Sequence, residues 1–142
     1  MKLELHFQDF KKAVILAERI AGKHMTLPVL SCLLFDIKKN SLLIKATNLD
    51  LGMEIAIPAK SDTEEVFAVP ASILSSFLSQ ISDYDGVVRL ESISGNIQIN
   101  TIKSKGLIKT VPHEDFPSIP IVTEEQKVQL NPEIIVKGLK SV

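Results

Sequence analysis

The strongest constraint on the fold is an order of elements that occurs twice along the chain. Alternating apolar residues predict a strand at residues 2–7, and apolar spacings of three and four predict a helix at residues 9–21. Three strand-like runs follow this helix, at residues 33–38, 42–47 and 52–58. The order then recurs, with a strand at residues 65–69, a helix from Pro70 to residue 82, and strands at residues 87–91, 96–102 and 106–111.

This duplication predicts an α+β fold of two strand-helix-strand-strand-strand units, with two helices packed on antiparallel sheets. Each helix has an apolar stripe that we expect to face the sheet. The first stripe consists of Phe10, Ala13, Val14, Ala17, Ile20 and Ala21. The second consists of Ile73, Leu74, Phe77, Leu78 and Ile81. The opposite side of the second helix carries hydroxyl groups, from Ser72, Ser75, Ser76 and Ser79.

The segment after Val111 is typical of a linker. Residues 112–125, PHEDFPSIPIVTEE, contain three prolines and four acidic residues, which interrupt any periodic pattern. We therefore expect one domain at residues 1–120, followed at residues 121–142 by a linker and the truncated start of a second domain, with a strand at 127–130 and a helix at 132–139. Because half a unit leaves its apolar face exposed, we expect the chain to be part of a longer protein.

The distribution of charge is more informative than its total. Sixteen Lys and Arg residues against seventeen Asp and Glu residues give a net charge of −1, which does not indicate nucleic acid. Residues 1–60, however, hold nine basic and six acidic side chains, a net charge of +3. We expect any anion-binding surface to lie in this half of the chain.

The single cysteine and the hydropathy pattern limit the environment of the protein. Cys32 has no neighbours at metal-ligand spacing and lies in an apolar run, which favours a small buried side chain over a reactive thiol. No apolar stretch is long enough to span a bilayer, and the charged first residues do not resemble a signal peptide. We expect a soluble cytoplasmic protein without a membrane partner.

No motif indicates catalysis. The histidines His6, His24 and His113 fall in a strand, a loop and the linker, and no nucleophile motif or Gly-rich phosphate loop accompanies them. The adjacent carboxylates Glu114 and Asp115 in a Pro-rich segment are more often solvated than catalytic. We therefore expect no enzymatic activity, no metal and no cofactor.

Four short motifs occur in an order and at a spacing that resemble a known family. They are TLPVL at residues 26–30, TNLD at 47–50, VPA at 69–71 and VPHEDFP at 111–117. With them, the chain resembles the N-terminal domain of the bacterial DNA sliding clamp, the beta subunit of DNA polymerase III. VQLNPEIIVKGL at residues 128–139 is similar to the opening of the second clamp domain.

The resemblance implies a three-domain subunit, two copies of which close head to tail into a ring around double-stranded DNA. Helices line the hole of such a ring and sheets lie outside. The ring tethers the replicative polymerase to its template and has no active site or cofactor. It would bind the polymerase and the clamp loader through parts that are absent from this chain.

The resemblance also implies which residues contact DNA. Lys11, Lys12 and Arg19 lie off the apolar stripe of the first helix, and Lys23 and His24 follow its end. Taken alone, this pattern is typical of a solvated helix face; the resemblance assigns it to phosphate contacts. The family usually has arginine at the position of His24. Many relatives have a basic residue at the position of Ser72, whose hydroxyl can hydrogen-bond phosphate without adding charge.

A second set of residues is implied at the ring interface. Lys103 and Lys105 align with basic residues that in relatives face acidic residues of the neighbouring subunit, although paired lysines on an edge strand also discourage aggregation. Gly106 stands where relatives often have an aromatic residue, which removes an apolar anchor. The alternative function is a free-standing protein interaction module with a clamp-like fold and no DNA role; the length of the natural reading frame would distinguish the two.

Overall fold

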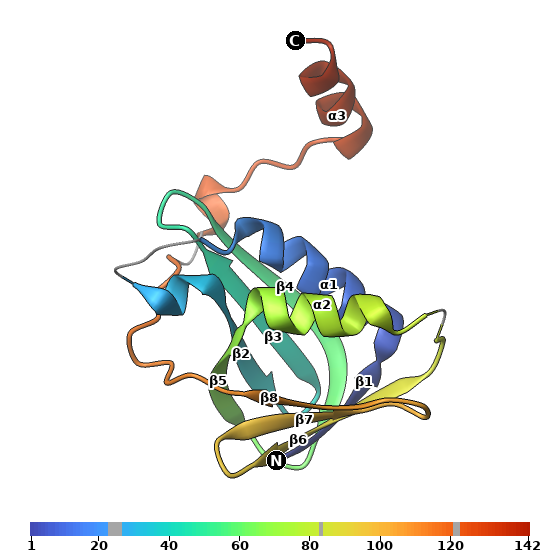
Figure 1. The fold of residues 1–142 in the computed structure, drawn as a ribbon. Helices are drawn as coiled ribbons and strands as arrows, with labels where there is room; N and C mark the ends of the chain where they lie inside the picture. Colours follow the sequence, from blue (N-terminus) through green and yellow to red (C-terminus); the bar gives the residue numbers. More distant parts are fainter. Residues whose placement is uncertain (23–26, 83, 121–122) are drawn as a thin grey trace.

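The computed structural model describes the whole chain except residues 23–26, 83 and 121–122. Eight strands, three α-helices and two 3-10 turns are assigned in the described residues, and Figure 1 shows their arrangement. The first half contains β1 (Lys2–His6), α1 (Phe7–Ile20), η1 (Pro28–Ser31), β2 (Cys32–Lys38), β3 (Ser41–Thr47) and β4 (Gly52–Ser61). The second contains β5 (Glu65–Pro70), α2 (Ala71–Gln80), β6 (Val87–Ile93), β7 (Asn96–Asn100), β8 (Lys105–Lys109), η2 (Glu124–Gln126) and α3 (Pro132–Lys140).

All eight strands form one antiparallel sheet in the order β5-β2-β3-β4-β1-β6-β7-β8. The N-terminal strand joins the two halves, because Leu3 of β1 is opposite Ser61 of β4 on one side and Leu90 of β6 on the other. The two ends of the order also meet. Ala68 of β5 and Val111, two residues beyond β8, exchange backbone hydrogen bonds of 2.8 and 3.3 Å. The sheet is therefore curved enough to bring its two edges together.

Helices α1 and α2 lie side by side across one face of this sheet (Figure 1). Their apolar faces and the facing strands enclose one core. Phe35 of β2 is fully buried in this core, with its ring edge-to-face against Phe10 of α1 at a centroid distance of 5.9 Å and tilted against Phe67 of β5 at 5.6 Å. The predicted α+β fold, with two helices packed alike on antiparallel strands, is confirmed.

The face that α2 buries differs from the prediction. The buried positions are Ala71, Leu74, Ser75 and Leu78, which follow the i, i+3, i+4, i+7 spacing of a helical stripe. Ile73 was predicted in this stripe but is 55% exposed. Ser75, predicted on the outer side, is buried. The buried face of α2 therefore includes the small side chains of Ala71 and Ser75, whereas the larger Ile73 lies outside it.

Two element boundaries also differ, and both are set by neighbouring strands. Pro70 was predicted as the first helical residue, but it ends β5 with extended backbone (φ −56°, ψ 118°) and α2 begins at Ala71. Residues 127–130 were predicted as a strand, and the structure has no strand there. An extended segment needs a neighbouring strand to satisfy its backbone, and none of the described strands pairs with this one.

The predicted helix at residues 132–139 is confirmed as α3. Its start is well specified, because the Asn131 side chain accepts a hydrogen bond of 3.0 Å from the Glu133 backbone N–H and Pro132 occupies the first turn. All residues of α3 are exposed. The division of the chain into a domain at 1–120 and the start of another at 121–142 stays a prediction.

Candidate nucleic-acid interface

The exposed cations of α1 lie on one side of the helix. Lys12 and Arg19 are both exposed and are seven residues apart, two turns along the same face. Among the described residues, neither forms an ion pair. Arg19 is in the last turn, where a cation also complements the helix dipole. Lys23 and His24, the other predicted contacts, lie outside the described residues.

Lys11 has a different environment from Lys12. Its Nζ donates a hydrogen bond of 3.2 Å to the carbonyl oxygen of Ile81, the C-cap residue of α2. The same Nζ lies 5.8 Å from the centroid of the Phe7 ring. Because carbonyl groups at a helix C-terminus carry partial negative charge, Lys11 links α1 to the end of α2. Sequence reasoning missed this link, since it joins residues that are 70 positions apart.

Helix α2 contributes no charge to this surface. Its sequence, ASILSSFLSQ, has no ionisable side chain, and Ser72, Ser76 and Ser79 are exposed. Ser72, Ser76 and Gln80 line a hollow of about 380 Å³ together with Ile73 and Phe77. The exposed face of α2 is therefore a mixture of hydroxyl and apolar groups.

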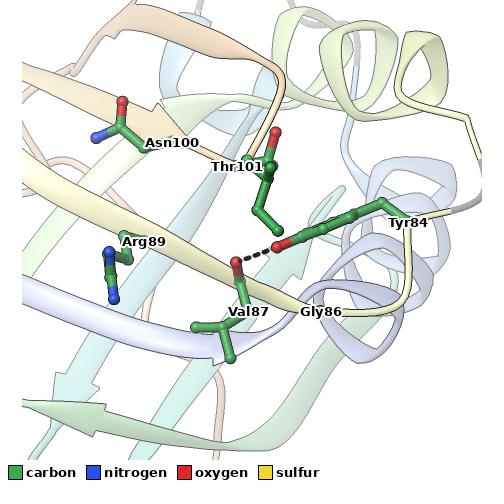
Figure 2. Close-up of a pocket in the computed structure, with 7 residues that line it drawn as sticks. Tyr84, Gly86, Val87, Arg89, Asn100 and Thr101 are labelled. Carbon is green, nitrogen blue, oxygen red and sulfur yellow. Dashed lines mark hydrogen bonds between the residues drawn. The ribbon is translucent and has the colours of Figure 1, made fainter.

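A second hollow, of about 350 Å³, lies where β6 and β7 approach the loop after α2 (Figure 2). The Tyr84 hydroxyl donates a hydrogen bond of 2.9 Å to the Val87 carbonyl oxygen at its rim. Arg89 also lines it, and its Nε donates to Glu4 Oε1 of the adjacent strand at 2.7 Å. The predicted DNA and ring residues do not line this hollow.

The TNLD motif forms a tightly hydrogen-bonded turn between β3 and β4. The Thr47 hydroxyl donates to the Leu51 carbonyl oxygen at 2.9 Å and accepts from the Leu49 N–H at 3.1 Å. Asn48 Oδ1 accepts from the backbone N–H groups of Asp50 and Leu51 at 3.0 and 2.8 Å. These bonds hold Leu49 in a left-handed conformation, φ 78°, that non-glycine residues rarely adopt. The TNLD motif therefore determines the conformation of the turn between β3 and β4.

The predicted ring-interface residues lie on β8, the last strand in the order of the sheet, and in the turn before it. Lys103 and Lys105 are exposed, as is Lys109 at the other end of β8. Among the described residues these lysines form no ion pair, and β8 is paired only with β7. Hydrogen bonds between Thr101 and Ser104, of 2.8 to 3.3 Å, fix the turn that carries Lys103. Lys105 begins β8 and Lys103 lies in the turn just before it, so both are on elements other than α1.

Gly106 is covered by an aromatic ring from α2. A Cβ atom at Gly106 would lie 2.6 Å from both Cε2 and Cζ of Phe77, closer than packed carbon atoms approach. The Phe77 ring therefore fills the space above the Gly106 backbone. Sequence reasoning missed this contact, because it interpreted Gly106 only as the loss of an apolar anchor. A glycine within a strand was the signal that could have indicated a close approach of another side chain.

Two further features concern reactive groups. Cys32 is buried as predicted, and burial raises the pKa of its thiol. In the part of the chain that the structure describes, no group of three or more His, Cys, Asp and Glu side chains is placed to hold a metal ion. None of the described helices is long and apolar enough to cross a membrane.

Residues 1–120 match the sequence pattern of the family described as "DNA polymerase III beta subunit, N-terminal domain". The chain belongs to this beta-subunit family. Among its relatives, the beta sliding clamp of Synechococcus elongatus is 22% identical over 142 residues, and that of Synechocystis sp. is 26% identical over 147 residues. Each alignment covers 99% of this chain and 38% of the relative. The chain thus spans well under half the length of these clamps.

Solved beta-subunit structures have the same fold. The DNA polymerase III beta subunit of Thermotoga maritima superposes with a TM-score of 0.78 at 23% identity, over 86% of this chain and 33% of that one. The Helicobacter pylori beta clamp bound to a DNA ligase peptide gives a TM-score of 0.77 at 22% identity, over 86% of this chain and 34% of the clamp. The family expected from the four motifs is confirmed by the sequence match.

Proposed function

We propose that this chain is the N-terminal domain of a DNA sliding clamp, a processivity factor that encircles duplex DNA within a ring-shaped dimer and catalyses no reaction. The observation that carries the proposal is the side-by-side placement of α1 and α2 on one face of a curved sheet. The side of α1 that does not pack on the sheet carries the exposed cations Lys12 and Arg19. The match of residues 1–120 to the beta-subunit family supports the same function.

Contacts to DNA in a sliding ring must be independent of sequence. Long cationic side chains meet this requirement, since phosphate contacts act through charge and carry no base information. Lys12 and Arg19 are the exposed cations of α1, and we assign the phosphate contacts mainly to them. Lys23 and His24 extend this set beyond the helix, and Ser72 contributes a hydroxyl from α2. Lys11 retains two ammonium protons beyond the one donated to Ile81.

The ring interface in this proposal is the edge of the sheet at β8. Lys103 and Lys105 face acidic side chains of the neighbouring subunit, and a strand of that subunit adds to β8. The polymerase and the clamp loader bind elsewhere on the subunit. The protein acts in the cytoplasm, in keeping with a single free cysteine.

Topological retention on DNA tests the proposal. The subunit that contains this chain is loaded by its clamp loader onto nicked circular DNA and separated by gel filtration. Retention on the circle, followed by release when the DNA is cut once, is the expected result. Release from the circle without cutting, at moderate salt, contradicts encirclement.

The isolated 142-residue chain provides a second measurement. It cannot close a ring alone, so we expect only weak, salt-sensitive DNA binding, with dissociation constants from tens of micromolar to millimolar. Tight or sequence-dependent binding would point to a different mode of DNA recognition. If instead the subunit binds peptides at the β8 edge and ignores DNA, the interaction-module alternative replaces the clamp function.

A further inference from the structure

The segment that follows β8 runs back along the domain instead of leaving it at once (Figure 1). It starts at Val111, which exchanges two backbone hydrogen bonds with Ala68 of β5. We call residues 111–119 the strap. Pro112 and Pro117 restrict its backbone, which reduces the entropy that the strap loses when it docks.

Phe116 is the first of two side chains that attach the strap to the domain. It packs against a small cluster formed by Val29 of η1, Cys32 of β2 and Ala68 of β5. All three cluster residues are buried. The Phe116 N–H donates to the His113 carbonyl oxygen at 2.9 Å, which closes a turn just before this contact. Detachment of the strap would therefore expose apolar surface on both sides of the contact.

Ile119 is the second attachment. A Cβ atom at Gly52, the first residue of β4, would lie 3.1 Å from Ile119 Cγ2. The Ile119 side chain therefore lies against the Gly52 backbone, and it is half-buried. Glycine in a strand often marks such a close approach. The absence of a side chain at Gly52 thus makes room for the end of the strap.

Both attachments lie on the face of the sheet opposite the helices. Phe35 of β2 packs on α1, so Cys32, three residues earlier in the strand, lies on the other face. Ile55 of β4 packs against the core, and Gly52 is likewise three residues earlier. The strap therefore crosses from β5 to β4 at the outer side of the strands β5-β2-β3-β4. It leaves uncovered the helical surface to which we assign the DNA contacts.

We propose that the strap, attached by Phe116 and Ile119, fixes the direction in which the chain leaves this domain and so sets the angle to the next domain of the clamp subunit. This assignment rests on the clamp function proposed above, which requires a next domain. A flexible linker that began at Val111 would let two domains take many orientations. Docking takes residues 111–119 out of that linker, and a closed ring needs the same angle in every subunit.

The Cys32 thiol reports whether the strap is docked, because Phe116 packs on the same cluster. In the subunit that contains this chain, Phe116→Ala should increase the rate of iodoacetamide modification at Cys32 by at least about tenfold. Val128→Ala removes an aliphatic side chain that is 78% exposed and lies beyond the strap; this control should leave the rate unchanged. Peptide mass spectrometry measures the rate. A folded Phe116→Ala variant that is modified as slowly as the unaltered subunit overturns the proposal.

The angle is measured as the distance between spin labels on Lys39→Cys, in the β2–β3 turn, and Lys137→Cys, in α3, with Cys32→Ala to remove the native thiol. Labelled subunits are diluted with unlabelled ones, so that only distances within one subunit are observed. Double electron–electron resonance should give a narrow distribution when the strap is intact. Phe116→Ala and Ile119→Ala should each widen it by at least about twofold, and the control variant should not.

An exchange of side-chain size tests the second attachment without weakening the first. Gly52→Val alone should displace Ile119 and widen the distribution, because even a Cβ would be 3.1 Å from its side chain. Gly52→Val with Ile119→Ala moves the aliphatic group from the strap to β4 and should restore the narrow distribution. A folded double variant that stays as wide as Gly52→Val overturns the role of this contact. Circular dichroism shows which variants fold; if Phe116→Ala does not, the residue 119 variants provide the test.

Failure of the strap and failure of the clamp function give different results. Distances that stay narrow in every folded strap variant, with the unaltered subunit still retained on circular DNA, overturn the strap alone; contacts between the domains then set the angle. A wide distribution in the unaltered subunit also overturns it. A narrow distribution that widens in the strap variants, in a subunit that is not retained on circular DNA, overturns the clamp function and leaves the strap as a device that orients two domains.

Discussion

The ammonium group of Lys11 lies 3.2 Å from the carbonyl oxygen of Ile81 and so joins the first turns of α1 to the end of α2. Lys11 is half-buried, and Lys12, the next residue, is exposed. Two adjacent lysines that look equivalent in the sequence therefore have different roles. One holds the two helices together, and the other is free to meet an anion.

Replacement of Lys11 by Met should lower the free energy of unfolding by about 1 kcal/mol, because the Ile81 carbonyl loses a charged donor. Lys12→Met is the control and should change the stability little, since its side chain is exposed. Urea unfolding of the 142-residue chain, followed by circular dichroism, compares the two. Equal stabilities for both variants would show that the Lys11 hydrogen bond is energetically unimportant.

Removing the exposed cations of α1 should weaken DNA binding by the ring and reduce its dependence on salt. Each phosphate contact contributes about 0.9 to the slope of log affinity against log salt concentration, so Lys12→Gln with Arg19→Gln should reduce the slope by about 2. Lys39→Gln with Lys60→Gln removes equal charge from exposed sites on the β2–β3 turn and β4. If both double variants reduce the slope equally, only net charge matters, and α1 has no special role.

A methyl group at Gly106 should destabilise the domain. The new Cβ would meet the Phe77 ring at 2.6 Å, and the required shift is expected to cost about 1–3 kcal/mol. The same Gly106→Ala change in a Phe77→Ala background should be nearly neutral, because the ring is gone. Thermal unfolding is measured for the unaltered chain, the two single variants and the double variant, which together form a double-mutant cycle. If the effects of the two changes on stability are additive, residues 77 and 106 are not in direct contact.

Acid should weaken the fold partly through Asp62. The Lys2 N–H donates to Asp62 Oδ1 at 2.7 Å, and this hydrogen bond lowers the pKa of the carboxyl group below its ordinary value. A lowered pKa in the folded state gives stability that is present above the unfolded pKa of about 3.9 and lost as pH falls through the folded value.

The corresponding measurement is urea unfolding between pH 2 and pH 6. In a plot of the free energy of unfolding against pH, Asp62→Asn should reduce the fall at low pH and should leave the shape of the curve near pH 6 unchanged. Asp50→Asn, at another exposed turn, serves as the comparison. An acid limb that is as steep in Asp62→Asn as in the unaltered chain would count against this origin of the pH dependence.

The Cys32 thiol should resist alkylation in the folded chain. Burial both shields the sulfur and raises its pKa, so less thiolate is present at pH 8 than for an exposed cysteine. Iodoacetamide followed by mass spectrometry should show slow modification in buffer and rapid modification in 8 M urea. Rapid alkylation without denaturant would mean that β2 and η1 open readily.

Local sequence patterns predicted most of the fold because they reflect local physical constraints. The period-two and period-3.6 patterns located α1, α3 and the eight strands of the sheet, and the repeat in element order predicted two helices on one antiparallel framework. The strand expected at residues 127–130 failed for a non-local reason, since alternation indicates only that a segment can pair. A partner strand is needed as well.

The site was harder to predict because its decisive contacts join distant positions. Lys11 and Ile81 are 70 residues apart, and the contact between Phe77 and Gly106 joins a helix to an edge strand. Neither contact follows from periodicity. Ile73 illustrates the same limit, because its hydrophobicity predicted a core position, whereas the helix buries the smaller Ser75 and leaves Ile73 exposed. The DNA and ring assignments of the individual lysines remain predictions.

The backbone bridge between Ala68 and Val111 limits what can be added to this sheet. It occupies the backbone just past β8, so the edge of the sheet that no described strand covers there is the five-residue strand from Lys105 to Lys109. The bridge therefore limits the length of the free edge. Inserting one residue between Lys109 and Val111 would shift the bridge by one position relative to β8 and, by the period of two, would turn the side chains that follow it to the opposite face.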